Sequence, residues 1–186
     1  VIYNSALNKL LNKDYEGASI EFDEVERQHP YSRWAKKSIL MSSYSSYKNE
    51  DYIKCEANIN RFISLYPASE LASYAQYLLA MCYYDQILDP ERDQTAVKMA
   101  YSTFNLIIDR YPETAYAKEA YYKIIFLEDS LAAKEMNVAK TYTSLKKYIA
   151  SLKRYKNIVN QYQTSSYVAE SLYRMVEIYL ILGVKD

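Results

Sequence analysis

Glycine is almost absent from this sequence: Gly17 and Gly183 are the only two in 186 residues, and there are four prolines. Folds with many tight turns between strands need glycine, so this scarcity argues against α/β and β-rich architectures. All four prolines fall where a helix would have to end, and we therefore predict an all-α protein. No apolar run is long enough to span a membrane, and the sequence contains no signal-peptide pattern. We expect the protein to extend beyond both ends of this sequence. A targeting signal could therefore lie upstream of Val1.

Catalytic motifs are lacking as well. His29 is the only histidine, and its place before Pro30 suits a structural or solvent-facing role. No Gly-rich phosphate loop, nucleophile motif or metal-ligand cluster at helical spacing occurs. We therefore predict no catalytic residue, no metal site and no cofactor.

Cysteine is limited to Cys55 and Cys82. Both fall on apolar positions of predicted helices, where a thiol behaves as a small hydrophobic group. Two cysteines make no disulfide framework, so we expect the two thiols to stay unlinked.

An excess of charge of either sign is also missing, because 23 basic residues balance 23 acidic ones. This balance argues against nucleic acid or an anionic membrane surface as a partner. Local clusters remain, since Lys146–Lys147 and Lys153–Arg154 flank one predicted helix turn. Such clusters are usually plain exposed surface, but Lys153 and Arg154 are also candidates for docking an acidic partner.

Tyrosine and internal repetition are what the sequence has in abundance. There are 23 tyrosines, against four phenylalanines and one tryptophan. Residues 51–69 repeat the pattern of residues 14–32, with Asp-Tyr at the start and Pro-x-Ser at the end. Equivalent positions such as Pro30 and Pro67 lie 37 residues apart. A fixed period of this size, with one helix pair per period, is typical of a tetratricopeptide-like solenoid.

We interpret the chain as a single domain, a right-handed superhelix of about nine helices. The repeats cover residues 1–31, 32–68, 69–113, 114–164 and 165–186, of which the last is incomplete. The predicted helices are Ile2–Asn12, Tyr15–Gln28, Arg33–Lys48, Tyr52–Leu65, Ser69–Tyr84, Gln94–Asp109, Ala115–Ser144, Tyr148–Tyr162 and Ser166–Leu182. The Pro-x-Ser/Thr signal places Ser32, Ser69 and Thr114 as N-caps, with Ser165 as a degenerate equivalent.

The repeats depart from the 37-residue period in the second half of the chain. Pro67 and Pro112 are 45 residues apart, and we assign the surplus to a loop insertion over residues 85–93. A tolerated surface loop explains it more simply than a functional one. The first helix of the fourth repeat would be about four turns longer than its counterparts. The last helix lacks a partner, so its stripe of Leu172, Val176 and Tyr179 is expected to lack cover within the repeat.

When the first helices of the repeats are aligned by the 37-residue offset, tyrosines recur at positions that share one helix face. Residues in one helix are three, four or seven positions apart and therefore share a face. For the leucines and Met81 we expect ordinary packing. For the tyrosines, packing and a groove for extended peptide both stay open, and rigid rings with a hydroxyl favour the groove. The candidate groove tyrosines are Tyr3, Tyr44, Tyr47, Tyr74, Tyr77 and Tyr84, and Leu7, Leu10, Leu40 and Met81 lie among them.

Several blocks of the sequence resemble the BamD family, outer-membrane lipoproteins of the β-barrel assembly machinery in Gram-negative bacteria. The similarity covers nearly the whole chain and is greatest to α-proteobacterial members. It depends on residues 24–32 (EVERQHPYS) with Trp34-Ala35, 61–67 (RFISLYP), 82–87 (CYYDQI) with 92–94 (RDQ), 134–136 (KEM), 162–166 (YQTSS), 169–172 (AESL) and 176–180 (VEIYL).

The resemblance implies a non-enzymatic scaffold with five helix pairs at the periplasmic face of the outer membrane. It implies a lipid anchor on an N-terminal cysteine upstream of Val1, since Cys55 and Cys82 do not match that position. The implied partners are the BamA periplasmic domains at the C-terminal repeats, other Bam lipoproteins, and unfolded outer-membrane protein segments in the N-terminal groove. Arg154 matches a family arginine that faces BamA. Two alternatives stay open, namely another periplasmic adaptor such as a Tol-Pal-associated coordinator, and an accessory domain of an enzyme.

Overall fold

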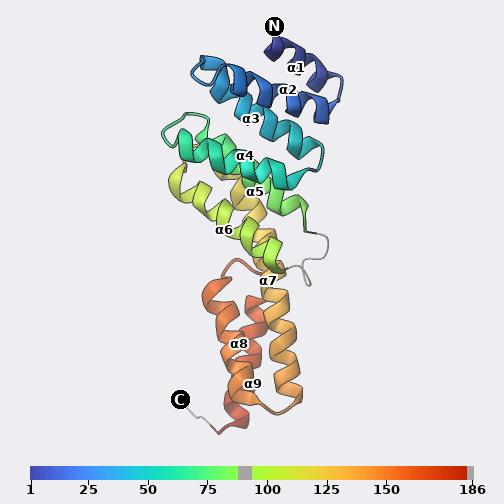
Figure 1. Cartoon of the computed structure of the whole chain (residues 1–186). Helices are drawn as coiled ribbons and strands as arrows, with labels where there is room; N and C mark the ends of the chain where they lie inside the picture. The colour runs from blue at the N-terminus through green and yellow to red at the C-terminus, as the bar shows by residue number, and fades with distance from the viewer. Residues whose placement is uncertain (88–93, 184–186) are drawn as a thin grey trace.

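The computed structural model describes residues 1–87 and 94–183, and within these ranges the chain is all helical (Figure 1). Most of the predicted insertion at 85–93 therefore lies outside the described residues. The helices are α1 (Ile2–Leu11), α2 (Tyr15–Gln28), α3 (Arg33–Lys48), α4 (Tyr52–Leu65), α5 (Ala72–Asp85), α6 (Gln94–Arg110), α7 (Ala115–Ser144), α8 (Tyr148–Gln161) and α9 (Val168–Ile181). The predicted all-α fold with nine helices is confirmed for this part of the chain.

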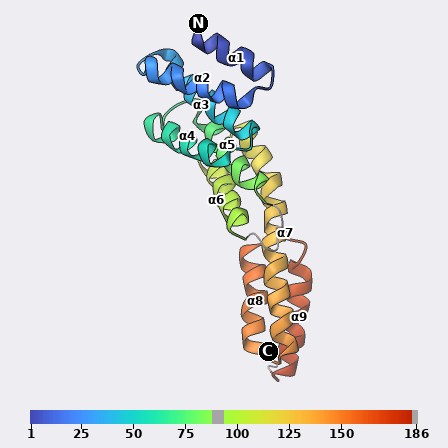
Figure 2. The same cartoon turned by 45° about the vertical axis from the view of Figure 1, so that its right-hand side comes forward.

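Consecutive helices pack against one another as hairpins, and the first helices of successive pairs also touch, α1 with α3, α3 with α5 and α5 with α7. This is the arrangement of a tetratricopeptide-like array. The molecule is elongated, with the two termini at opposite ends, and α7 runs from the upper block of helices into the lower one (Figures 1 and 2).

The turns inside three of the pairs have the same construction. Lys13, Glu50 and Lys146 each adopt a positive φ of 57° to 63°, the left-handed conformation that usually selects glycine after a helix. In the first two turns the next residue, Asp14 or Asp51, caps the following helix by accepting from a backbone N–H. Lys147 occupies this place in the third turn, where no side chain caps α8.

The restarts between pairs follow two patterns rather than the single one predicted. Ser32 and Thr114 cap α3 and α7 directly by accepting from the N–H three residues ahead. The Oγ atoms of Ser69 and Ser165 instead accept from the N–H two residues ahead. A short turn therefore comes first, and α5 and α9 begin three residues after the serine. The prediction that these two serines are N-caps was wrong for that reason.

Four apolar clusters follow one another along the array and form its core. Helix α7, at 30 residues, contributes to two of them. Its first half, up to Leu131, packs with α5 and α6, and its second half, from Ala132, packs with α8 and α9. The predicted long helix is thus confirmed, and its length joins two separate cores.

A polar junction lies at the middle of α7. The Glu128 carboxylate is buried and accepts from the Tyr101 hydroxyl of α6 and from the Thr164 hydroxyl in the α8–α9 turn. Next to it, Asp129 accepts from the Ser165 hydroxyl and the Ser166 N–H, both at 2.8 Å. These bonds hold the C-terminal helices to the rest of the array.

The outer face of α9 is largely exposed in the described part of the chain. Leu172 and Val176 are 47% and 57% exposed. Tyr179 differs from the prediction, because its ring is half-buried against α8 with the Lys156 ammonium 5.7 Å from its centroid. Within the described ranges, no helix is both long and apolar enough to cross a membrane.

Candidate binding surfaces

Five of the six candidate tyrosines lie on two adjacent first helices, Tyr44 and Tyr47 on α3 and Tyr74, Tyr77 and Tyr84 on α5. All five side chains are half-buried. Each ring is therefore fixed by packing on one side while part of it still reaches the surface. Leu40, in contrast, is buried, and Met81 packs against the core, as expected for those two.

Two of these tyrosines direct their hydroxyl groups to carboxylates of the same array. Tyr47 donates to Asp85 at the end of α5, and Tyr77 donates to Glu119 on α7. Burial, together with these hydrogen bonds, raises the pKa of both phenols. Because the hydroxyls have internal acceptors, what Tyr47 and Tyr77 present to a ligand is ring surface.

Rings from α7 extend the row beyond the residues that were predicted. The Tyr116 ring lies 5.7 Å from Tyr74 and 5.2 Å from Tyr77 between centroids. The Phe126 ring lies 6.1 Å from Tyr84, and the Lys123 ammonium is 4.3 Å from the same Tyr84 centroid. We call Tyr44, Tyr47, Tyr74, Tyr77, Tyr84, Tyr116 and Phe126 the tyrosine face.

The sequence prediction did not include the α7 residues, because it aligned the first helices of only the first three repeats. Tyr116, Glu119, Lys123 and Phe126 are spaced by three or four residues, so the rule that grouped the other tyrosines would also have found them. The helix α3 contributes a cation as well, since the Lys48 ammonium lies 5.7 Å from the Tyr44 centroid and 5.5 Å from that of Tyr47.

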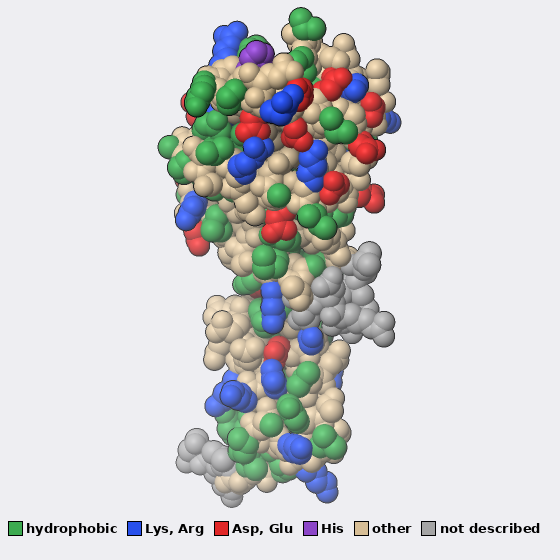
Figure 3. Space-filling view, viewed as in Figure 1, with side chains coloured by type: hydrophobic (Ala, Val, Ile, Leu, Met, Phe, Trp, Pro, Cys, Tyr) green, Lys and Arg blue, Asp and Glu red, His purple; other side chains and the backbone are tan. Residues whose placement is uncertain are grey.

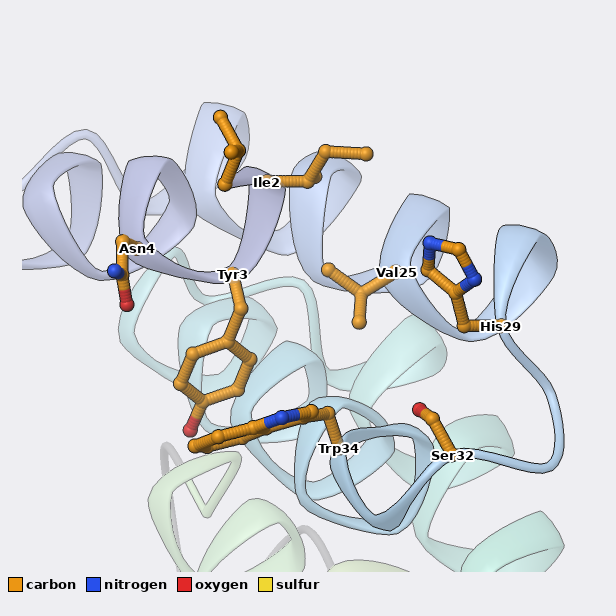
Figure 4. A pocket seen from close by; sticks show the side chains of 8 residues that line it. Ile2, Tyr3, Asn4, Val25, His29, Ser32 and Trp34 are labelled. Atoms are coloured by element: carbon orange, nitrogen blue, oxygen red, sulfur yellow. The ribbon is translucent and has the colours of Figure 1, made fainter.

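Tyr3 lies apart from the tyrosine face. Its ring packs on Trp34 in the first turn of α3, with 4.8 Å between centroids. Trp34 precedes Tyr44 by ten residues, or about 15 Å along the helix. Figure 4 shows Tyr3 over the indole, with Val25 and His29 at the end of α2 nearby. These residues line a pocket of about 500 Å³. The structure thus places Tyr3 in a separate N-terminal pocket.

The predicted partner residues Lys153 and Arg154 lie on α8 in different environments. Lys153 is exposed. The Arg154 side chain is 43% exposed and forms an ion pair with Glu135 of α7 at 3.1 Å. One side of the guanidinium is thus occupied inside the array, and the other faces solvent.

Charge is distributed unevenly between the two ends, although the net charge is zero. Residues 132–183 contain eight Lys or Arg and three Asp or Glu, whereas residues 1–131 contain 14 and 19. Basic side chains accordingly predominate on the visible face of the lower part of Figure 3, over α8, α9 and the second half of α7. This end suits an acidic partner. Among the described residues, no group of three His, Cys, Asp or Glu could hold a metal ion.

Helix pairs stacked in sequence define a tetratricopeptide-like array. The chain belongs to the YfiO family of outer membrane lipoproteins, whose model matches residues 1–186. The predicted resemblance is therefore confirmed. The family's members are non-enzymatic assembly factors, in line with the absence of catalytic motifs in the sequence.

Relatives named as outer membrane protein assembly factor BamD match the whole chain or nearly all of it. The protein of Caulobacter vibrioides, an α-proteobacterium, is 40% identical over 186 residues, which are all of this chain and 61% of the relative. That of Rickettsia prowazekii is 35% identical over all of this chain and 74% of the relative. That of Neisseria gonorrhoeae is 32% identical over 92% of this chain and 68% of the relative. The chain thus spans about three fifths to three quarters of the length of these proteins.

Proposed function

We propose that this chain is a non-enzymatic scaffold of the β-barrel assembly machinery, with one binding surface at each end. Segments of unfolded outer-membrane proteins bind along the tyrosine face of the N-terminal repeats. The periplasmic domains of BamA bind the basic C-terminal repeats, and other Bam lipoproteins join the same assembly. In the whole protein, a lipid on a cysteine upstream of Val1 holds the scaffold at the periplasmic face of the outer membrane.

The half-buried tyrosine face is the observation that carries the proposal. Rings already held by their neighbours lose little conformational freedom when a ligand binds, which makes aromatic rings effective contact residues. Strands of outer-membrane barrels alternate apolar and polar side chains and carry aromatic side chains at both membrane interfaces; these apolar and aromatic side chains suit a row of rings. Because the Tyr47 and Tyr77 hydroxyls have internal partners, contact with ring surface would dominate over hydrogen bonding.

The uneven charge supports the second surface. The C-terminal helices have an excess of cations, and Lys153 and Arg154 lie there on α8. An acidic patch on a partner would be drawn to this end and not to the acidic N-terminal part. The interaction should accordingly weaken as salt is added, whereas peptide binding at the tyrosine face should not.

Site-specific photo-crosslinking tests both surfaces in one experiment. A photoreactive residue at Tyr44 should capture an unfolded barrel protein, and one at Lys153 should capture the BamA periplasmic domains. Ile53 on α4, which is 85% exposed and lies outside the tyrosine face, is the control position. Equal capture at Tyr44 and Ile53 would contradict the proposed peptide surface, and no BamA adduct at Lys153 would contradict the second one.

A further inference from the structure

Cys55 of α4 and Cys82 of α5 meet in the core between the second and third repeats. The Cys82 thiol donates to the Cys55 sulfur at an Sγ–Sγ distance of 2.8 Å. A disulfide holds its sulfurs at about 2.05 Å, so the two atoms are within about 1 Å of bonding distance. These are the only cysteines in the sequence, and each can therefore pair within the chain only with the other.

We propose that Cys55 and Cys82 are a modification site at which a disulfide joins the second repeat to the third. The sulfurs face each other among apolar neighbours such as Ile59, Phe62 and Leu79, and both side chains are fully buried. A disulfide suits this pair better than a bound metal ion does, because the described residues supply no third His, Cys, Asp or Glu to complete a metal site. In the structure both cysteines are free thiols, as the sequence-based expectation had it, and the disulfide is what the proposal adds.

The reaction is a thiol–disulfide exchange with an external disulfide, for which oxidised glutathione is a sufficient model. The thiolate of one cysteine attacks a glutathione sulfur, forming a mixed disulfide and releasing one glutathione. The second cysteine then attacks the protein sulfur of that mixed disulfide and releases the other glutathione. The two protein thiols lose two protons and two electrons, and the glutathione disulfide gains them.

Oxidation has to take place while the chain folds, or during an opening of the α4–α5 contact. Both sulfurs are out of reach of solvent in the folded state. The hydrogen bond with Cys55 and burial also raise the pKa of the Cys82 thiol, which disfavours the reactive thiolate there. In a cell the proposed periplasmic location would supply the oxidising conditions. Disulfide formation in the isolated chain requires no partner, so its outcome is separate from that of the proposed function.

The link would fix α5 against α4, and α5 supplies three tyrosines of the tyrosine face. The chain between the two cysteines forms the junction of two repeats, and a solenoid is held together only by contacts between neighbouring repeats. A covalent bond at this junction prevents the first two repeats from separating from the third.

Intact mass provides the test. The chain is unfolded in urea, refolded in a buffer of oxidised and reduced glutathione, and then treated with N-ethylmaleimide in denaturant. We expect a monomer about 2 Da lighter than the reduced chain, with no maleimide added, and a tryptic fragment that links the Cys55 and Cys82 peptides. Refolding in dithiothreitol, which prevents the bond from forming, should give a melting temperature about 5–10 °C lower, given the loop that the bond closes.

The Cys55→Ala and Cys82→Ala variants are the controls, since neither can form the internal bond and dithiothreitol should leave their melting temperatures unchanged. Two maleimides on a refolded wild-type chain with native helicity would overturn the proposal. Disulfide-linked dimers, glutathione adducts that persist, or a linked chain without native helicity would also overturn it. The wild-type comparison requires no substitution, so a variant that fails to fold does not weaken the test.

Discussion

The Arg154 guanidinium on α8 donates to both carboxylate oxygens of Glu135 on α7, at 3.2 and 3.1 Å. An arginine held in this way presents its remaining N–H groups in a fixed direction. If that direction faces BamA, Arg154→Glu should weaken binding of the BamA periplasmic domains by about 30-fold or more, because losing a desolvated charge costs about 2 kcal/mol or more. Titration calorimetry at low salt measures the loss.

The matched control for Arg154 is Glu135→Gln, which breaks the ion pair but keeps the cation. As the pair is partly exposed, its loss should cost at most about 1 kcal/mol of folding stability. We expect Glu135→Gln to bind BamA within a few fold of wild type. Equal affinity of Arg154→Glu and wild type would show that Arg154 is not at the interface.

Glycine should stabilise the three turns that hold other residues in the left-handed conformation. Lys13, Glu50 and Lys146 all have positive φ. Replacing each by glycine removes a steric cost of about 1 kcal/mol, offset in part by the greater freedom of glycine in the unfolded chain. We expect higher urea midpoints for Lys13→Gly, Glu50→Gly and Lys146→Gly. The preceding residues Asn12 and Asn49 have negative φ, and glycine there should lower the midpoint instead.

A substitution should be able to supply the side-chain N-cap that α8 lacks. Asp14 and Asp51 cap their helices, whereas Lys147 at the equivalent place provides no acceptor. Lys147→Asp should add about 1 kcal/mol of stability through the new hydrogen bond and the favourable charge at the helix start. Asp51→Ala should lose a similar amount. A thermal melt of Lys147→Asp that is unchanged or lower would show that the α7–α8 turn cannot adopt the capping geometry.

Alkaline pH should destabilise the protein through its tyrosines. Burial is the leading cause that raises the pKa of Tyr47, Tyr74, Tyr77 and Tyr83 above the ordinary value. A group whose folded pKa is raised contributes stability that is complete below its unfolded pKa and is lost as pH rises above it. For tyrosine that loss begins near pH 10.

Spectrophotometric titration at 295 nm measures this effect, with circular dichroism followed in parallel. We expect the folded protein to show fewer tyrosinates at pH 10–11 than the protein in urea, and the rest to ionise only as helicity is lost. Complete ionisation at the pH found in urea, with helicity intact, would contradict the burial of these phenols.

The helices could be predicted within a few residues because prolines and capping side chains fix where they begin and end. Ser32 and Thr114 determine the starts of α3 and α7 locally, and the 37-residue offset transfers the pattern along the chain. Ser69 shows the limit of that transfer, since an identical signal is followed by an extra turn.

Contacts between distant residues could not be predicted in the same way. A repeat offset shows which positions are equivalent, but not which side chain of a neighbouring helix each one meets. The Tyr47–Asp85 and Tyr77–Glu119 hydrogen bonds, the junction at Glu128 and the meeting of the two cysteines all depend on such contacts. Tyr3 likewise has the same pattern as the other tyrosines but packs at a different place, on Trp34.

Whether the tyrosine face binds client peptide is the central question, and it calls for a control matched in burial. Tyr83 and Tyr101 are half-buried tyrosines whose hydroxyls also bond to carboxylates, of Glu56 and Glu128, but they are not part of the tyrosine face. Because Tyr101 bonds to the buried Glu128, the double variant Tyr83→Ala with Tyr101→Ala should lose at least as much stability as Tyr47→Ala with Tyr77→Ala. If the Tyr47/Tyr77 variant binds the peptide more weakly than the Tyr83/Tyr101 variant, the difference is due to lost peptide contacts and not to lost folding stability.

The most direct measurement is the affinity of these variants for a fluorescent C-terminal peptide of an outer-membrane barrel protein, well below their melting temperatures. We predict that Tyr47→Ala with Tyr77→Ala weakens binding by about 30-fold or more, the cost of a hot-spot aromatic of about 2 kcal/mol. Tyr47→Phe with Tyr77→Phe, which keeps the rings, should bind nearly as well as wild type, and added salt should change little. Equal losses in the Tyr83/Tyr101 control, or wild-type affinity without the Tyr47 and Tyr77 rings, would show that these tyrosines pack the array and do not bind its client.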